Sequence, residues 1–131
     1  AVLGSGNAVL TDFGLAKCIA AVPSERRRGS TVGSAGYMPP EVVCGKAQGP
    51  AVDWWGFGVL LVEAGLGRHP FQLKDGQVPC EAVVGRQPVL QLLDVELHTS
   101  TRDLVEQLLI KDPADRLAEW RSIRGHPFFA G

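Results

Sequence analysis

The sequence has few cysteines and no long apolar run. Its three cysteines, Cys18, Cys44 and Cys80, are widely spaced and include no CxxC pair. Such a set speaks against a disulfide framework or a zinc site and indicates a reducing compartment. The longest apolar run, 54–62, is nine residues long, whereas a membrane-spanning helix needs about 20. No signal peptide is visible either, so we expect an intracellular protein, cytoplasmic or nuclear, without a membrane partner.

The sequence also lacks a large excess of positive or negative charge. The formal net charge is -1, and 21% of the 131 residues are charged. A balanced composition gives no attraction to nucleic acid, so no nucleic-acid partner is expected. The main local excess is a basic cluster, Arg26, Arg27 and Arg28. A chain of this length is expected to form one domain with a hydrophobic core.

The N-terminal part is expected to contain the only strands. Two short β-favouring runs, 1–3 and 8–11, flank the Gly-Ser-Gly-Asn stretch at 4–7, which predicts a β-hairpin. Residues 18–36 are dominated by Ser, Gly, Arg and Pro without a period, as expected of a long loop. Long loops of this kind inside domains are usually functional or disordered.

The remainder reads as mostly helical. Residues 51–64 are apolar almost all round, which predicts a helix buried on every side. The capping-box spacing at 100–103 and the periodic apolar residues after it predict a second helix, which Pro113 ends. A shorter helix is expected over 118–124, and helix and loop in unknown order over 80–97. Trp54, Trp55 and Phe57 are expected to be core residues and not a stacking platform for nucleic acid.

Asp12 lies in the stretch VLTDFGLAK at 9–17, between a β-favouring run and an aromatic–glycine pair. Taken alone, a single Asp-Phe-Gly tripeptide is compatible with a plain turn or with a metal ligand. The motifs that follow it along the chain separate these two interpretations. They occur in this order: TDFG (11–14), GYMPPE (36–41), VDWWGFG (52–58), GRHPF (67–71), LLIKDPADRL (108–117) and HPFF (126–129).

The order and spacing of these motifs resemble the C-terminal lobe of a protein kinase, and DWW and HPFF resemble the AGC group of serine/threonine kinases most. The resemblance implies a protein-kinase-like C-terminal lobe of α+β class, mainly α with the short hairpin. It divides the chain into a strand and loop over 1–17, an activation segment over 12–41 and a helical core over 42–129. No His-Arg-Asp triplet occurs in the sequence, so the family's catalytic base and its N-terminal lobe are not matched.

The resemblance assigns roles to the Asp-Phe-Gly motif. In kinases its carboxylate coordinates magnesium that bridges the phosphates of ATP, and Asp12 matches that carboxylate. A single carboxylate suits magnesium, which keeps several waters and binds phosphates. Phe13 and Gly14 would serve as packing residue and hinge.

The resemblance also places a phosphorylation site in the long loop. Ser30 falls where AGC kinases carry their activating phosphate, and the neighbouring Thr31 is the alternative acceptor. Lys17 matches a residue that helps bind that phosphate, which carries close to two negative charges. The alternative is a solvated basic loop that is never modified. Ser34 matches the residue that supports the substrate site in serine/threonine kinases, although it could also be an ordinary loop serine.

Three further residues are expected to be structural. Glu41 and Arg116 match a buried ion pair that ties the activation segment to the base of the lobe. Asp53 in the family holds the catalytic loop, and the alternative here is that it serves only as a helix cap near the start of 51–64. His69, His98 and His126 lack metal-ligand spacing and are expected to be structural or exposed.

Three positions depart from the family pattern. Pro39 replaces the usual alanine, Gly36 stands where many AGC members have an acid, and Gly56 where serine is common. Proline at 39 removes one backbone donor and favours an extended residue before it. These departures bear on the substrate-docking surface more than on the fold.

The sequence therefore predicts an ATP- and Mg²⁺-dependent serine/threonine protein kinase, present as its C-terminal lobe and inactive alone. Its expected partners are protein substrates with serine or threonine in a basic context, and an upstream activating kinase. The alternative is a non-catalytic, pseudokinase-like binding or scaffold module.

Overall fold

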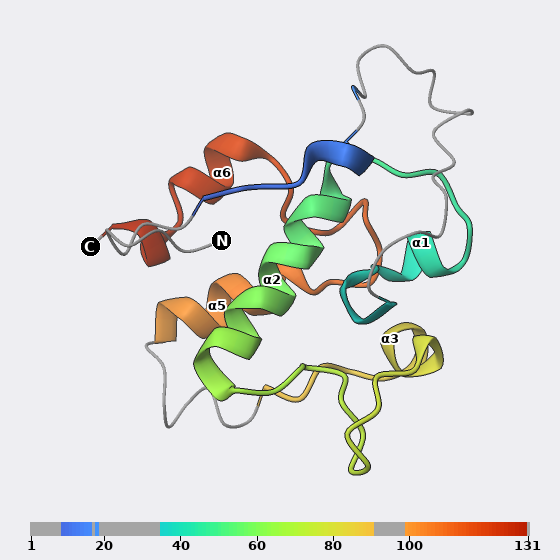
Figure 1. Cartoon of the computed structure of the whole chain (residues 1–131). Coiled ribbons are helices and arrows are strands. Elements are labelled where there is room, and N and C mark those ends of the chain that lie inside the picture. Colours follow the sequence, from blue (N-terminus) through green and yellow to red (C-terminus); the bar gives the residue numbers. More distant parts are fainter. Residues whose placement is uncertain (1–8, 17, 19–34, 91–98, 131) are drawn as a thin grey trace.

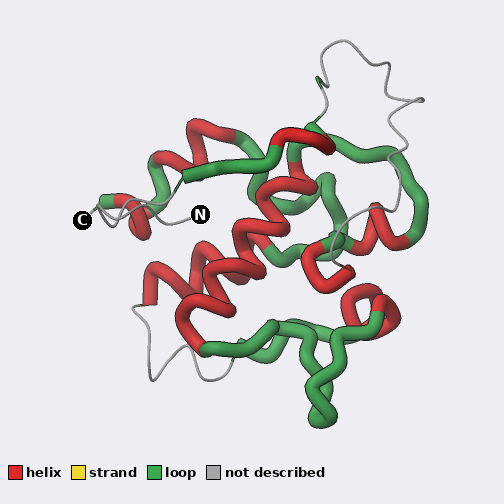
Figure 2. Tube along the Cα trace, in the orientation of Figure 1, coloured by secondary structure: helices red, strands yellow, loops and turns green. Residues whose placement is uncertain are grey.

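The computed structural model describes residues 9–16, 18, 35–90 and 99–130. In this part of the chain the secondary structure is helical, and Figure 2 shows helix and loop without strand. None of these helices combines the length and apolarity needed to cross a bilayer. The elements, labelled as in Figure 1, are the α-helices α1 (Pro40–Val43), α2 (Ala51–Leu66), α3 (Cys80–Gly85), α5 (Thr99–Leu108) and α6 (Trp120–Arg124), and the 3-10 helices η1 (Phe13–Leu15), η4 (Ala35–Tyr37) and η5 (Pro127–Phe129).

The predicted N-terminal hairpin is not supported. Of its two runs, only 9–11 are described, and these residues are not in a strand. Leu10 is 88% exposed, so burial of its side chain does not stabilise a strand here. A two-stranded hairpin is stable in water only when a hydrophobic face of it packs against another element. The mainly helical class is otherwise confirmed for the described residues.

Helix α2 runs through the middle of the molecule (Figure 1). It ends at Gly67, whose φ of 65° is the left-handed conformation that suits glycine at a helix C-terminus. One side of the helix, with Trp55, Val59 and Val62, is fully buried. Leu60 is 53% exposed, so the prediction of a helix buried on every side was wrong. A stripe of apolar residues, rather than the whole circumference, faces the core.

The core lies where α2 contacts α5 and the loop that follows α2. The rings of Trp55 and Phe71 stack in it, with centroids 5.5 Å apart and planes inclined by 4°. The other buried members of this cluster are Val59, Val62, Ala82, Val83, Leu90, Val105 and Leu109.

The aromatic neighbours of Trp55 only partly follow the prediction that they are core. Trp54 and Phe57 are partly exposed. The ring of Trp54 stacks on that of Trp120 in α6 with centroids 6.1 Å apart, and Trp120 is itself an exposed residue. A second, peripheral aromatic contact therefore joins α2 to α6.

The other helices were located correctly, with shifted ends. Helix α5 includes Ser100, so this residue is not the N-cap that its capping-box position predicted. Helix α6 begins at Trp120, two residues later than expected, because the side chain of Glu119 accepts a hydrogen bond from Ser122 N (2.7 Å) and caps it. In the segment 80–97, helix α3 comes first.

The contact between α2 and α5 requires glycine at position 58. A Cβ atom on Gly58 would lie 3.0 Å from Leu108 Cβ and 3.0 Å from Leu109 Cδ2, whereas a Cβ on Gly56 would meet nothing within 4 Å. We expect Gly58→Ala to lower the free energy of unfolding by about 1–3 kcal/mol through overpacking. Gly56→Ala is the control, and should be neutral or stabilising by up to about 1 kcal/mol, because alanine favours the helix. Urea denaturation of both variants checks this; equal midpoints for the two would contradict it.

Candidate functional site

Arg116 is directed into the protein by the turn that follows α5. Pro113 cannot continue a helix. The carboxylate of Asp112 accepts a hydrogen bond from Ala114 N at 2.9 Å, and the Asp112 carbonyl accepts from Arg116 N at 3.1 Å. An aspartate that bonds to the backbone two residues later is a common way to form a tight turn. The LLIKDPADRL motif thus forms a turn that brings Arg116 back to the core.

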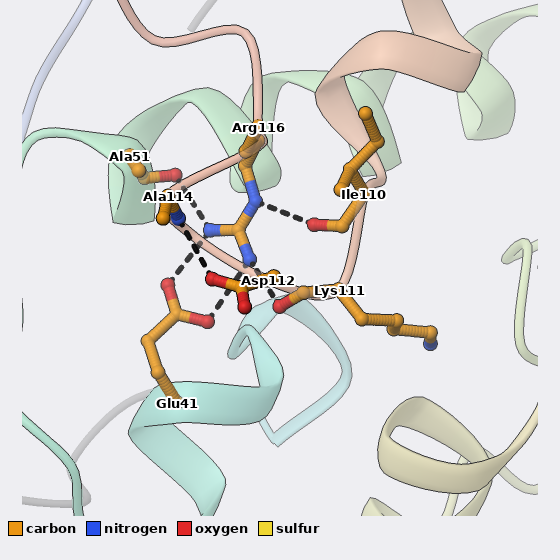
Figure 3. Close-up of polar contacts among 7 residues, drawn as sticks. All are labelled: Glu41, Ala51, Ile110, Lys111, Asp112, Ala114 and Arg116. Atoms are coloured by element: carbon orange, nitrogen blue, oxygen red, sulfur yellow. Dashed lines mark hydrogen bonds and ion pairs between the residues drawn. The ribbon is translucent and has the colours of Figure 1, made fainter.

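The guanidinium of Arg116 is buried with all five of its N–H groups hydrogen-bonded (Figure 3). Two of them bind the carboxylate of Glu41, from Nη1 to Oε1 at 2.7 Å and from Nη2 to Oε2 at 2.9 Å. The other three bind the backbone carbonyls of Ala51 (2.9 Å), Ile110 (2.8 Å) and Lys111 (3.1 Å). Such paired geometry matches the planar fork of arginine. The expected ion pair is present, and it joins residues 75 positions apart.

Glu41 is placed by a short helix that two prolines begin. Pro39 is extended, with φ −72° and ψ 163°, and its carbonyl accepts hydrogen bonds from Val42 N (3.0 Å) and Val43 N (3.1 Å). Pro40 occupies the first helical position, where its missing N–H leaves no bond unmade. Glu41 then lies in the first turn, where the helix dipole favours a carboxylate. The departure at Pro39 is thus accommodated by the helix start.

Lys111 lies beside the same cluster, and the sequence did not single it out. Its Nζ is 3.9 Å from the centroid of the Phe71 ring and 5.1 Å from that of Trp55, and it donates a hydrogen bond to the carbonyl of Val83. Burial, and then the positive charge of Arg116, lower the pKa of Lys111 to about 8. The available signal in the sequence was its place directly after the apolar residues 108–110.

The Asp-Phe-Gly stretch lies at the surface. Asp12 has φ 63° and ψ 69°, a left-handed conformation that is uncommon outside glycine and that aspartate tolerates. Its side chain faces Gly14, where a Cβ would lie 3.4 Å from Asp12 Oδ1. Phe13 is 70% exposed, so its ring is largely uncovered in this structure, and the packing role that the resemblance implies for it stays a prediction.

A magnesium ion would fit Asp12 only as one ligand among several. The described residues hold no group of three or more His, Cys, Asp or Glu side chains that could bind a metal. Asp12 itself is exposed, so its carboxylate is accessible. A single accessible carboxylate is a suitable protein ligand for magnesium when phosphates and waters supply the remaining oxygens.

The end of the predicted activation segment is held against α2. Tyr37 donates a hydrogen bond from its hydroxyl to the carboxylate of Glu63. That bond, more than burial, raises the pKa of Tyr37. His69 Nε2 lies 2.7 Å from the carbonyl oxygen of Gly36. His69 is one of the histidines predicted to be structural or exposed, and it is buried here.

Several predicted residues are not part of this cluster. Lys17, Ser30, Thr31, Ser34 and His98 lie outside the described residues. Asp53 is exposed in the first turn of α2, where the dipole favours its charge, but the N-cap of that helix is Pro50 and no side chain caps it. The structure thus brings together Glu41 and Arg116, and it places Asp12 apart at the surface.

The ion pair gives a direct stability prediction. Glu41→Gln leaves the buried guanidinium without its counter-charge, so we expect the free energy of unfolding to fall by about 3–5 kcal/mol. The control is Glu106→Gln, which removes the exposed pair with Arg102 in α5 (2.7 Å) and should cost about 0.5 kcal/mol or less. Urea denaturation at neutral pH measures both. A loss at Glu41 no larger than that at Glu106 would refute the anchoring role.

Lys111 gives a pH prediction. Its pKa in the folded protein is about 8, below the ordinary value of 10.5, so between these values the unfolded chain binds more protons than the folded one. Stability from this group therefore rises with pH from about 8 to 10.5. We expect the free energy of unfolding of the wild type, minus that of Lys111→Met, to increase over this range. A difference that stays constant or falls as the pH rises would contradict the lowered pKa of Lys111 in the folded protein.

Comparison with known proteins adds the family. The protein kinase domain model matches residues 2–129. Among curated relatives, the serine/threonine-protein kinase KIPK2 of Arabidopsis thaliana is 39% identical over 86% of this chain and 12% of its own length. Serine/threonine-protein kinase AGC1-5 of the same plant is 40% identical over 85% of this chain and 20% of its own length. Ribosomal protein S6 kinase alpha-4 of Mus musculus is 39% identical over 96% of this chain and 17% of its own length.

The chain spans at most about a fifth of the length of these relatives. Even so, the match runs from the second residue to the HPFF motif. The two motifs that meet at the Glu41–Arg116 pair both lie inside it. The chain belongs to the protein kinase domain family, with AGC-type serine/threonine protein kinases among its relatives.

Proposed function

We propose that this chain is the C-terminal-lobe part of an ATP-dependent serine/threonine protein kinase. The observation that carries the proposal is the meeting of two kinase motifs, GYMPPE and LLIKDPADRL, at a buried and fully hydrogen-bonded ion pair. This pair fixes the end of the activation segment to the base of the lobe. Phosphoryl transfer depends on positioning and charge stabilisation, so a fixed segment next to the substrate is the contribution this half can make.

Asp12 is the residue through which this half would reach the nucleotide. Protein kinases generally use ATP and Mg²⁺, and the exposed carboxylate of Asp12 is accessible to an ion held by phosphates. Bound there, magnesium would neutralise the charge that develops on the transferred phosphoryl group. The left-handed backbone at Asp12 and the absence of a side chain at Gly14 leave room for the carboxylate.

The loop between these two regions would carry regulation. Phosphate on Ser30, or on Thr31 as the alternative, would pair with Lys17, and an upstream kinase would add it. Ser34 would support the substrate site. We expect the substrates to be proteins with serine or threonine in a basic context. An intracellular location, cytoplasmic or nuclear, agrees with three free cysteines.

An activity assay tests the proposal in two arms. The 131-residue chain alone, with Mg-ATP and an Arg-rich serine peptide, should show no turnover above background, because it contains no His-Arg-Asp triplet to supply the base. The chain joined to the upstream half of the S6 kinase alpha-4 domain should phosphorylate the peptide. In that chimaera, Asp12→Ala should lower kcat on the order of 10³-fold.

The matched control in the chimaera is Asp75→Ala, because Asp75 is an exposed acid whose side chain accepts a hydrogen bond from the neighbouring Gln77 N (3.0 Å). It should leave kcat unchanged. Turnover by the isolated chain, or a chimaera indifferent to Asp12→Ala, would overturn the assignment. Peptide binding by the chain with no turnover in either arm would favour the non-catalytic module instead.

A further inference from the structure

His69 is a buried titratable residue that the proposed mechanism does not use. It is 7% exposed and lies in the GRHPF motif directly after α2. Its Nδ1 accepts a hydrogen bond from Phe71 N at 3.1 Å, and its Nε2 is 2.7 Å from Gly36 O. A backbone N–H can only donate and a carbonyl can only accept. The ring is therefore neutral, with its proton on Nε2.

The bond to Phe71 is a property of the local sequence. Pro70 has no N–H to offer, so the next amide along the chain, that of Phe71, is the one that reaches the ring. The second His-Pro-Phe of the chain repeats the pattern, with His126 Nδ1 accepting from Phe128 N at 3.2 Å. The outer nitrogens differ in their partners, because His126 Nε2 contacts the carboxylate of Asp103 at 2.9 Å. Of these two histidines, His69 is the one whose outer nitrogen bonds to backbone of the predicted activation segment.

Gly36 is matched to this ring. A Cβ at position 36 would lie 3.1 Å from His69 Nε2 and 3.4 Å from its Cδ2, so a side chain there would push the ring away. The Tyr37 ring packs edge-on to the imidazole, with centroids 5.9 Å apart and planes at 85°. The departure from the family pattern at Gly36 therefore makes room for a contact to His69.

Protonation would be incompatible with this arrangement. A proton on Nδ1 would face the N–H of Phe71, so two donors would oppose each other at 3.1 Å and the ring would have to move. The titratable groups that face His69 are the phenol of Tyr37 and the carboxylate of Glu63. Arg68 precedes His69 directly in the same loop. Burial lowers the pKa of His69, and this outweighs the Gly36 carbonyl and Glu63, which raise it.

We propose that His69 is a positioning residue whose neutral ring holds the Gly36 carbonyl, and with it the segment 35–38, and that protonation of the ring releases this segment. The inference concerns the conformation of the chain itself. Only its consequence for substrate docking, a weaker peptide interaction at mildly acidic pH, rests on the proposed function.

Tyr37 is the single tyrosine of the chain, so tyrosine labelled with ¹³C at Cζ alone gives one NMR signal next to the proposed contact. We expect this signal to shift between about pH 8 and pH 5. The midpoint of the shift should coincide with the pKa of the His69 ring, which lies below the ordinary histidine value of 6.5. Ring ¹⁵N shifts should show the Nε2–H tautomer at the upper end of this range. In His69→Gln the side-chain amide can donate to the same carbonyl but cannot titrate, so the Tyr37 signal should stay near its high-pH position throughout.

Two further variants complete the test. His126→Gln is the matched control from the second His-Pro-Phe and should keep the Tyr37 titration. Gly36→Ala should move the Tyr37 signal toward its low-pH position even at pH 8, because the added Cβ displaces the ring. A Tyr37 signal that stays fixed while His69 protonates, the same titration in His69→Gln, or an Nδ1–H tautomer at high pH would each overturn the proposal. None of these readouts requires kinase activity.

Discussion

The burial of one guanidinium constrains the rest of the fold. A charged group removed from water is stable only when its charge is paired and its donors are bonded. Arg116 meets this requirement with Glu41 from α1, Ala51 from the start of α2, and the carbonyls of Ile110 and Lys111 after α5. Three segments distant in sequence must therefore meet at one point. Their meeting fixes the position of α1, which carries Glu41.

The same constraint extends through the aromatic core to the other end of the segment 35–41. The guanidinium carbon of Arg116 lies 4.9 Å from the centroid of Trp55, and Trp55 stacks on Phe71. Phe71 in turn donates its backbone N–H to His69, which contacts Gly36. The segment is thus held at both ends by basic side chains of different character. Arginine keeps its charge at all relevant pH values, whereas histidine titrates close to neutrality.

The sequence predicted the parts of this structure that depend on local pattern or on a strongly specified family spacing. The buried stripe of α2 follows from its apolar composition, but the exposure of Leu60 does not, because composition cannot say which side lacks a neighbour. The ion pair could be anticipated only from the family resemblance, since no periodicity relates residues 75 positions apart. The contact between His69 and Gly36 could not be anticipated, because it depends on the tertiary approach of a loop to a residue without a side chain. The exposure of Phe13 could not be anticipated either, because the cover of a ring depends on its tertiary neighbours.

A double-mutant cycle on Glu41 and Arg116 tests the central claim most directly. The variants are Glu41→Gln, Arg116→Met and the two combined, and the free energy of unfolding is measured for each by urea denaturation. If the buried pair holds the segment, the double variant should be more stable than the sum of the single losses predicts, by about 3 kcal/mol or more, because it leaves no unpaired charge in the core. Losses that add to within about 0.5 kcal/mol would show that the two side chains act independently, and would contradict the account.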